Sequence, residues 1–118
     1  MSQPAQESAI AVTKAYEFAL WLLPKTENFP KTYRMSLGDR LVTAVLDQLQ
    51  MLVRASYAGD KMPLLRSASE HANELRYLLR LAKDLKVLPL KSYDFAAEKS
   101  DEIGRMVGGW MKSQVRKP

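Results

Sequence analysis

The apolar residues of one segment recur with a spacing that suits a helix packed against other helices. Along this segment the gaps alternate between three and four residues, at Leu65, Ala68, Ala72, Leu75, Leu79 and Ala82. A period near 3.5 residues places all of them on one narrow stripe, as at the seam of a bundle or a coiled coil. Such a stripe must be buried against neighbouring helices, so the pattern predicts an all-α fold.

Proline and glycine divide the rest of the chain into further segments that are rich in strong helix formers. We expect helices over about residues 7–23, 36–58, 61–86 and 90–113, with loose termini. No stretch alternates apolar and polar residues for long enough to predict a strand. Four helices with short connections predict an antiparallel up-down-up-down four-helix bundle. A chain of 118 residues is long enough for one such domain, residues 1–118.

Four residues are expected to mark the ends of these helices. Pro24 is predicted to end the first helix, because the residue before a proline disfavours the helical conformation. Ser36 is predicted to cap the start of the second helix, and Gly59 is predicted to cap its end. Asp60 is predicted to cap the start of the third helix.

The last expected helix contains glycines, which are unfavourable in a helix interior. Gly104 and Gly108 lie four residues apart and therefore share one face, where another helix could approach closely. The alternative is that the helix frays after Arg105.

The composition excludes several classes of active site. The chain has no cysteine, which excludes disulfides, thiolate metal sites and cysteine nucleophiles. Its single histidine, His71, borders the apolar stripe and is expected to be packed rather than catalytic. Glu98 and Glu102 share a helix face but lack the histidine motifs of di-metal bundles, so we expect a solvated acidic surface. We therefore expect no catalytic residue, no metal site, no cofactor and no enzymatic activity.

The early part of the chain resembles neither a targeting signal nor a membrane-spanning segment. Residues 1–7 lack the basic region of a secretory signal. The most apolar early stretch, residues 18–23, is much shorter than the roughly 20 residues that span a bilayer. We expect a cytoplasmic protein with no membrane partner.

One face of the third expected helix is basic. The chain carries 18 lysines and arginines against 13 acidic residues, a formal net charge of +5. At about 100° per residue, Arg80 and Lys83 lie within about 40° of Arg76. Arg66 and Lys86 flank this stripe at about 80° on either side. An arginine can donate two hydrogen bonds to one phosphate, so these residues are candidates for binding a nucleic-acid backbone.

The acidic residues of the same helix fall on a neighbouring arc, at Glu70, Glu74 and Asp84. The alternative to a binding stripe is therefore an ordinary solvated face, on which pairs such as Arg80–Asp84 neutralise the cations. Helical geometry alone leaves both interpretations open.

The chain carries more large apolar side chains than four helix seams can bury. Tyr77 and Leu81 lie outside the stripe of the third helix, and Leu20 and Trp21 make the first helix apolar on more than one side. Exposed apolar patches usually mark association surfaces, so we expect a homo-oligomer. The alternative is a locally overfilled core, with Trp21 at a helix end.

Four segments carry a family resemblance. They read FALWLLPKTENFPK at residues 18–31, KMPLLR at 61–66, LRYLLRLAKDLK at 75–86 and DEIGRMVGGW at 101–110. Together they resemble the accessory variability determinant (Avd) proteins of diversity-generating retroelements. Those proteins are grouped with the small four-helix proteins of ribosomal-RNA intervening sequences. The first and last segments are the specific ones, because a Leu/Arg-rich helix is common in bundles.

The resemblance implies a four-helix bundle that assembles as a five-membered ring with a positively charged surface. It also implies a non-catalytic subunit that binds nucleic acid and the retroelement's reverse transcriptase, and so supports mutagenic complementary DNA synthesis and retrohoming. Carried over by position, the basic residues of the third helix are Arg76, Arg80, Lys83 and Lys86. Arg105, in the last segment, would either join this charged surface or pair with another subunit.

Two other functions remain open at this point. The chain could be an intervening-sequence four-helix protein without a reverse transcriptase partner. It could also be a structural helical oligomer whose basic face binds an acidic protein. Phosphate contacts carry no sequence information, so the stripe does not distinguish RNA from DNA or from a hybrid.

Overall fold

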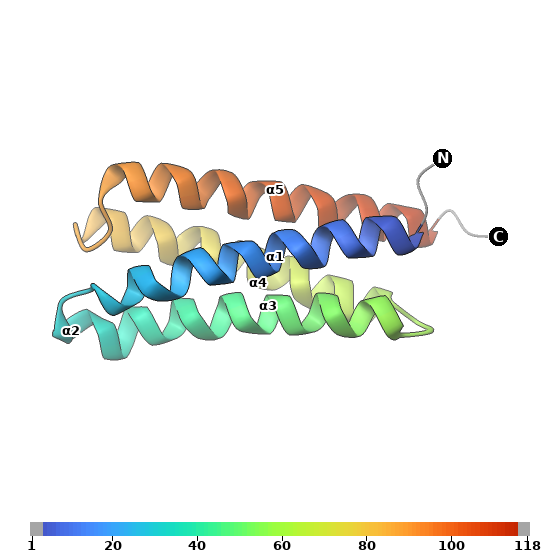
Figure 1. Ribbon diagram of the computed structural model, residues 1–118, viewed down its shortest axis with the longest axis horizontal. Helices are drawn as coiled ribbons and strands as arrows, with labels where there is room; N and C mark the ends of the chain where they lie inside the picture. The colour runs from blue at the N-terminus through green and yellow to red at the C-terminus, as the bar shows by residue number, and fades with distance from the viewer. Residues whose placement is uncertain (1–3, 116–118) are drawn as a thin grey trace.

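Four long helices form an elongated bundle in the computed structural model, which describes residues 4–115 (Figure 1). The bundle measures 50 × 22 × 19 Å along its principal axes. A short helical turn and a five-residue π-helix join the first two long helices. The elements are α1 (Pro4–Glu27), α2 (Lys31–Tyr33), η1 (Arg34–Gly38), α3 (Asp39–Tyr57), α4 (Met62–Asp84) and α5 (Leu90–Val115).

Each long helix packs against two neighbours. α1 lies against α3 and α5, and α4 lies against the same two helices, so α1 and α4 occupy diagonal corners of the bundle. Successive long helices run in opposite directions, and the start of α1 lies at the same end of the molecule as the end of α5 (Figure 1). The prediction of an all-α, up-down-up-down four-helix bundle is confirmed.

The residues of the predicted stripe are those that α4 buries in the core. Every residue of the stripe is buried, with no more than 9% of its surface exposed. Trp110 of α5 is the largest fully buried side chain. Gln48 of α3 is also fully buried, and its Nε2 donates a hydrogen bond to the carbonyl oxygen of Ala68 on α4 (3.4 Å). This bond joins α3 to α4 inside the apolar core.

Pro24 does not end the first helix, so that prediction is wrong. α1 continues through Pro24 to Glu27. A proline removes its own backbone donor and crowds the carbonyl group four residues earlier, but here it lies on the exposed side close to the helix end. The hydroxyl of Thr26 donates to the carbonyl oxygen of Leu23 (2.8 Å), and the buried ring of Phe29 holds the chain that follows. These local contacts allow one further turn of helix.

Ser36 does not cap the second long helix either. It lies within η1, where its hydroxyl donates to the carbonyl oxygen of Thr32 (3.3 Å). η1 continues into α3 without a break, because the backbone N–H of Asp39 bonds to the carbonyl oxygens of Arg34 and Ser36. Leu37, buried in the core, holds this turn in place. The helical path therefore begins before the residue with the best capping side chain.

A lysine, rather than the predicted glycine, supplies hydrogen bonds to the free carbonyl groups at the end of α3. The helix ends at Tyr57 and Ala58 is extended, so Gly59 is not its C-cap. Lys61 Nζ donates hydrogen bonds to the carbonyl oxygens of Ala55 (2.7 Å) and Ala58 (2.8 Å). A cation at this position also complements the negative end of the helix dipole.

The ends of α4 differ slightly from those predicted. Lys61 occupies the N-cap position, while Asp60 Oδ1 accepts a hydrogen bond from the backbone N–H of Met62 (3.4 Å). Asp60 thus satisfies one free amide without being the cap itself. At the other end the helix stops at Asp84, and Lys86 adopts a left-handed conformation with φ of 63°.

α5 runs without interruption through its glycines, so the alternative of fraying after Arg105 is wrong. Gly104 faces α4, where an added Cβ would lie 4.0 Å from the Cβ of Ala72. An added Cβ at Gly108 or Gly109 would meet nothing within 4 Å in the single chain. Of the two glycines predicted to share a face, Gly104 is the one that lies against α4.

Replacing Gly109 by alanine is expected to stabilise the fold. The new methyl group meets no neighbour, and alanine restricts the unfolded chain while favouring the helix. We expect the free energy of unfolding to rise by about 0.5–1 kcal/mol, measured by urea denaturation at fixed protein concentration. A loss of stability together with a smaller particle mass would instead place Gly109 in a contact between copies of the chain.

Candidate nucleic-acid interface

The basic stripe of α4 lies beside α5. Arg76 Nη2 is 3.1 Å from Asp101 Oδ1 of α5, and Lys83 Nζ is 4.7 Å from the centroid of the Tyr93 ring. These two contacts place the stripe on the α5 side of the helix. The side chains of Arg76 and Arg80 are 61% and 65% exposed, so their guanidinium groups are accessible to a large ligand.

Each cation of the stripe also has an acidic partner. Arg76 pairs with Asp101, while Asp84 lies 3.9 Å from Arg80 Nε and 3.5 Å from Lys83 Nζ. The Arg80–Asp84 pair that belongs to the alternative interpretation is therefore present. Exposed ion pairs of this kind contribute only about 0–1 kcal/mol, so a phosphate can replace the carboxylate at little cost.

The two flanking residues lie differently from the stripe. Arg66 is exposed near the start of α4 and forms no ion pair with any side chain of residues 8–115. Lys86 lies beyond the end of α4, where the backbone N–H groups of Val87 and Leu88 bond to the carbonyl oxygen of Ala82. The expectation that Lys86 flanks the stripe on the same helix is wrong, because the chain has already left the helix at this residue.

α5 supplies a further arginine to this side of the molecule. A hollow of about 320 Å³ lies between α4 and α5, and Arg76 and Arg105 both line it. Ala72 and Gly104 belong to the same lining, where the two helices approach each other. Its polar lining residues are Ser69, Asn73, Ser100 and Asp101.

Periodicity could not have identified the α5 partners of the stripe. Asp101 and Tyr93 meet Arg76 and Lys83 because the two helices run antiparallel in one particular register. The only signal in the sequence was that Asp101 and Arg105 lie four residues apart, on one face of a helix that also carries small residues.

The opposite side of α4 is acidic. A larger hollow, of about 1120 Å³, lies between α3 and α4. Its lining includes three carboxylates but a single arginine, Arg40. His71 also lines it; this histidine is half-buried, as predicted, with Nδ1 3.7 Å from Glu74 Oε2. α4 thus lies between a hollow lined by two arginines and a hollow whose charged lining residues are mainly carboxylates. The carboxylates are those of Asp39, Asp47 and Glu74.

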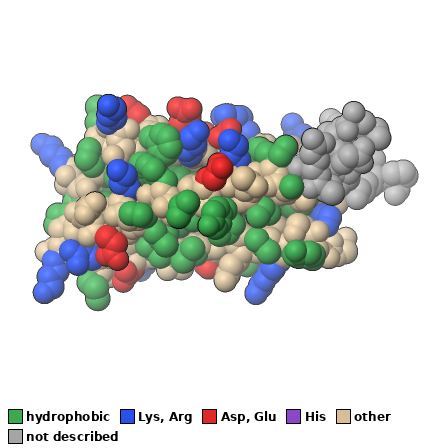
Figure 2. Space-filling view, viewed as in Figure 1, with side chains coloured by type: hydrophobic (Ala, Val, Ile, Leu, Met, Phe, Trp, Pro, Cys, Tyr) green, Lys and Arg blue, Asp and Glu red, His purple; other side chains and the backbone are tan. Residues whose placement is uncertain are grey.

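The face formed by α1 and α3 exposes several large apolar side chains. Tyr16 and Leu20 of α1 are 56% and 63% exposed, and Leu46 and Val53 of α3 are 37% and 38% exposed. Figure 2 shows hydrophobic side chains gathered along the middle of this face. We call these four residues the α1–α3 apolar patch. A patch of this kind on a small protein is typical of an association surface.

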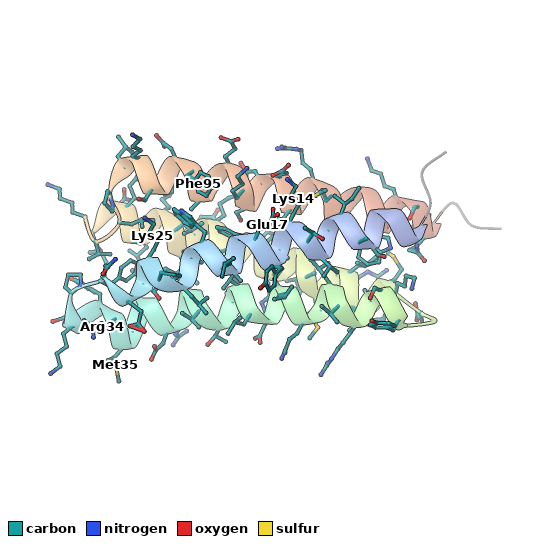
Figure 3. All side chains as sticks on the ribbon, viewed as in Figure 1. Lys14, Glu17, Lys25, Arg34, Met35 and Phe95 are labelled. Carbon is teal, nitrogen blue, oxygen red and sulfur yellow. The ribbon has the colours of Figure 1, made fainter. Side chains whose placement is uncertain are left out.

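Trp21, by contrast, packs within the single chain. Its ring lies 4.7 Å from the ring of Phe95 on α5, measured between centroids, and Lys25 Nζ lies 5.3 Å from the Trp21 ring. Figure 3 shows Phe95 on α5 and Lys25 on α1 toward the same end of the bundle. The additional apolar side chains of the first helix therefore have two different environments. Trp21 covers the contact between α1 and α5, whereas Leu20 faces solvent.

Residues 4–115 offer neither a metal centre nor a membrane-spanning segment. Among the side chains that the structure describes, those of residues 8–115, no group of three or more His, Cys, Asp or Glu is arranged to hold a metal ion. None of the helices in the same range is both long enough and apolar enough to cross a membrane.

Comparisons with known proteins agree with this architecture. No curated protein matches the chain significantly. Among solved structures, a protein of unknown function from the S23 ribosomal protein family of Bacteroides thetaiotaomicron matches with a TM-score of 0.83. The two sequences are 17% identical, and the match covers 90% of this chain and 98% of the other, which shows a shared fold. A family model described as bAvd-like matches residues 9–114, and the chain therefore belongs to the bAvd-like family.

Proposed function

We propose that this chain is a non-catalytic, nucleic-acid-binding accessory subunit of a diversity-generating retroelement reverse transcriptase. In this role it supports mutagenic complementary DNA synthesis and retrohoming in the cytoplasm. Membership of the bAvd-like family supports the accessory role and the association with a retroelement. The reverse transcriptase supplies the catalysis, and the accessory protein supplies a charged surface.

The observation that carries this proposal is the basic side of α4. Arg76 and Lys83 contact α5, and Arg80 lies between them on the same stripe of α4, which spans about two helical turns. Both guanidinium groups are exposed, and the carboxylate partners of all three cations are weak. Arg66, near the start of α4, and Lys86, just beyond its end, are also exposed and are included in the proposed binding surface. Contacts to phosphates position a nucleic acid without reading its sequence, so specificity comes from the polymerase or from the shape of the nucleic acid.

The second part of the proposal is that several copies act together, as a ring of five. The α1–α3 apolar patch supports association, because a second copy of the chain would remove it from water. Assembly would also repeat the basic side around the ring. Several weak phosphate-binding surfaces that act on one nucleic acid bind more tightly than any one of them alone.

Light scattering on the purified protein tests this function directly. The particle mass is expected to be about five times the 13.4 kDa of the single chain. Adding a structured RNA at low salt is expected to raise the mass further, and moderate salt is expected to reverse that increase. A 13.4 kDa particle that is indifferent to RNA would contradict both parts of the proposal.

A further inference from the structure

The hollow between α4 and α5 has a lining that suits the binding of one phosphate group. Two arginines from different helices, Arg76 and Arg105, line the same space of about 320 Å³. We propose that this hollow holds one phosphodiester group of the bound nucleic acid between the two guanidinium groups, and that Asp101 occupies the position of that phosphate in the free protein. This inference rests on the proposed function and specifies how the ligand is held.

The shape of the hollow follows from the small residues in its lining. Ala72 of α4 and Gly104 of α5 face each other there, and an added Cβ at Gly104 would be only 4.0 Å from the Cβ of Ala72. The absence of larger side chains at this level leaves space between the longer side chains of Arg76 and Arg105. Ser69 and Asn73 add uncharged hydrogen-bond donors to the same lining.

The charges in the hollow are unbalanced in favour of an anion. Asp101 Oδ1 lies 3.1 Å from Arg76 Nη2, whereas Arg105 forms no ion pair among the described residues. The carboxylate therefore satisfies one of the two guanidinium groups. A phosphodiester group carries the same charge as the carboxylate but can accept hydrogen bonds from both arginines.

Two physical arguments favour the phosphate over Asp101. The side chains of Arg76 and Asp101 are 61% and 47% exposed, so their pair is worth little and opens readily. Binding a nucleic acid also releases condensed counterions, which a side-chain carboxylate cannot do. Asp101 thus competes weakly with the phosphate for Arg76, and it orders the Arg76 side chain in the free protein.

The test measures binding of a short fluorescein-labelled single-stranded RNA to the full chain by anisotropy, over a series of KCl concentrations. Asp101→Asn is expected to bind about three- to five-fold more tightly, because the competing charge is removed. Glu98→Gln is the matched control, since it removes one charge from an exposed glutamate of α5 outside the hollow. Its affinity is expected to change less than about two-fold.

The double variant Arg76→Ala/Arg105→Ala distinguishes one shared phosphate from two separate ones. For single strands the slope of log K against log salt falls by about 0.7 for each phosphate that the protein no longer neutralises. We expect the slope of the double variant to fall by about 0.7 in total, because both arginines hold one group. A fall near 1.4 would show that the arginines bind different phosphates and would overturn the proposal. Circular dichroism confirms that each variant is folded.

The remaining outcomes separate this inference from the proposed function. A DNA of the same sequence is expected to give the same fold-changes, because both polymers offer a phosphodiester group. One outcome is that the wild-type chain binds RNA while Asp101→Asn binds it no more tightly than Glu98→Gln does. That result would overturn the proposed phosphate site and leave the proposed function unaffected. If the wild-type chain binds neither polymer, the proposed function fails as well.

Discussion

Replacing Arg76 and Arg80 together by alanine is expected to weaken binding of a structured RNA by about 30-fold at low salt. Each guanidinium group would lose charge-assisted hydrogen bonds to phosphate oxygens, and part of this loss is offset because Asp101 and Asp84 no longer compete. The log–log salt slope is expected to fall by about 0.7–1.8, the equivalent of one to two phosphates. Both quantities come from one anisotropy titration repeated over a series of salt concentrations.

The same double variant is expected to keep its fold and its particle mass. Both side chains are more than half exposed, and their ion pairs contribute only about 0–1 kcal/mol each. Thermal unfolding followed by circular dichroism measures the first property, and light scattering measures the second. A folded variant of normal mass whose salt slope equals that of the wild type would remove these two arginines from the binding surface.

A second double variant controls for the change in net charge. Arg40→Ala/Arg54→Ala also removes two positive charges, but from exposed positions on α3. Arg40 lines the acidic hollow between α3 and α4, where a polyanion is repelled. At about 0.1 M salt we expect less than about a three-fold loss of affinity, because surface charges more than about 10 Å from the ligand are then screened. Equal losses in the two double variants would mean that overall charge, rather than the basic side of α4, controls binding.

The part of the fold that sequence predicts best is the part that depends on local periodicity. The stripe from Leu65 to Ala82 is buried along its whole length, because a helix with one apolar side has one favourable orientation in a bundle. Helix ends depend on contacts made elsewhere in the chain. At Pro24 and Ser36 the sequence contains strong end signals, but the burial of Phe29 and Leu37 in the core outweighs them.

The sequence predicts which residues of the candidate site share a side of α4, but it does not predict which residues of α5 face them. Angles along a helix place Arg76 and Arg80 on one side of α4 whatever its neighbours are. Whether Asp101 or Arg105 faces them depends on the rotation and register of α5, which apolar spacing restricts only loosely. For the same reason, helical spacing offered the ion pair between Arg80 and Asp84 as part of the alternative interpretation, but it gave no sign of the pair between Arg76 and Asp101.

Replacing Leu20 by glutamate is expected to dissociate the proposed ring into single chains. Leu20 belongs to the α1–α3 apolar patch with Tyr16, Leu46 and Val53, and its side chain is directed away from the core of its own bundle. In an assembly that covers this patch, the new carboxylate would be buried without a partner, at a cost of several kcal/mol per contact. In the single chain it remains in water, so the bundle stays folded. Light scattering would then give a mass near 13.4 kDa.

Leu90→Glu provides the matched control for this variant. Leu90 is 64% exposed, against 63% for Leu20, but it lies at the start of α5 and outside the α1–α3 apolar patch. A carboxylate is favourable in the first turn of a helix, so this variant is expected to keep both its stability and the wild-type mass. If Leu90→Glu dissociates the particle and Leu20→Glu does not, the contact between copies involves the end of the bundle that carries Leu90.

Dissociation by Leu20→Glu also separates the two parts of the proposed function. The basic side of α4 is intact in the single chain, so RNA binding should persist and should still depend on Arg76 and Arg80. Its affinity should fall about 10²-fold or more, because several surfaces no longer act on one RNA. An unchanged affinity per chain would mean that one bundle is the complete binding unit. The α1–α3 apolar patch would then contribute to assembly alone, and the ring would not be needed to hold the nucleic acid.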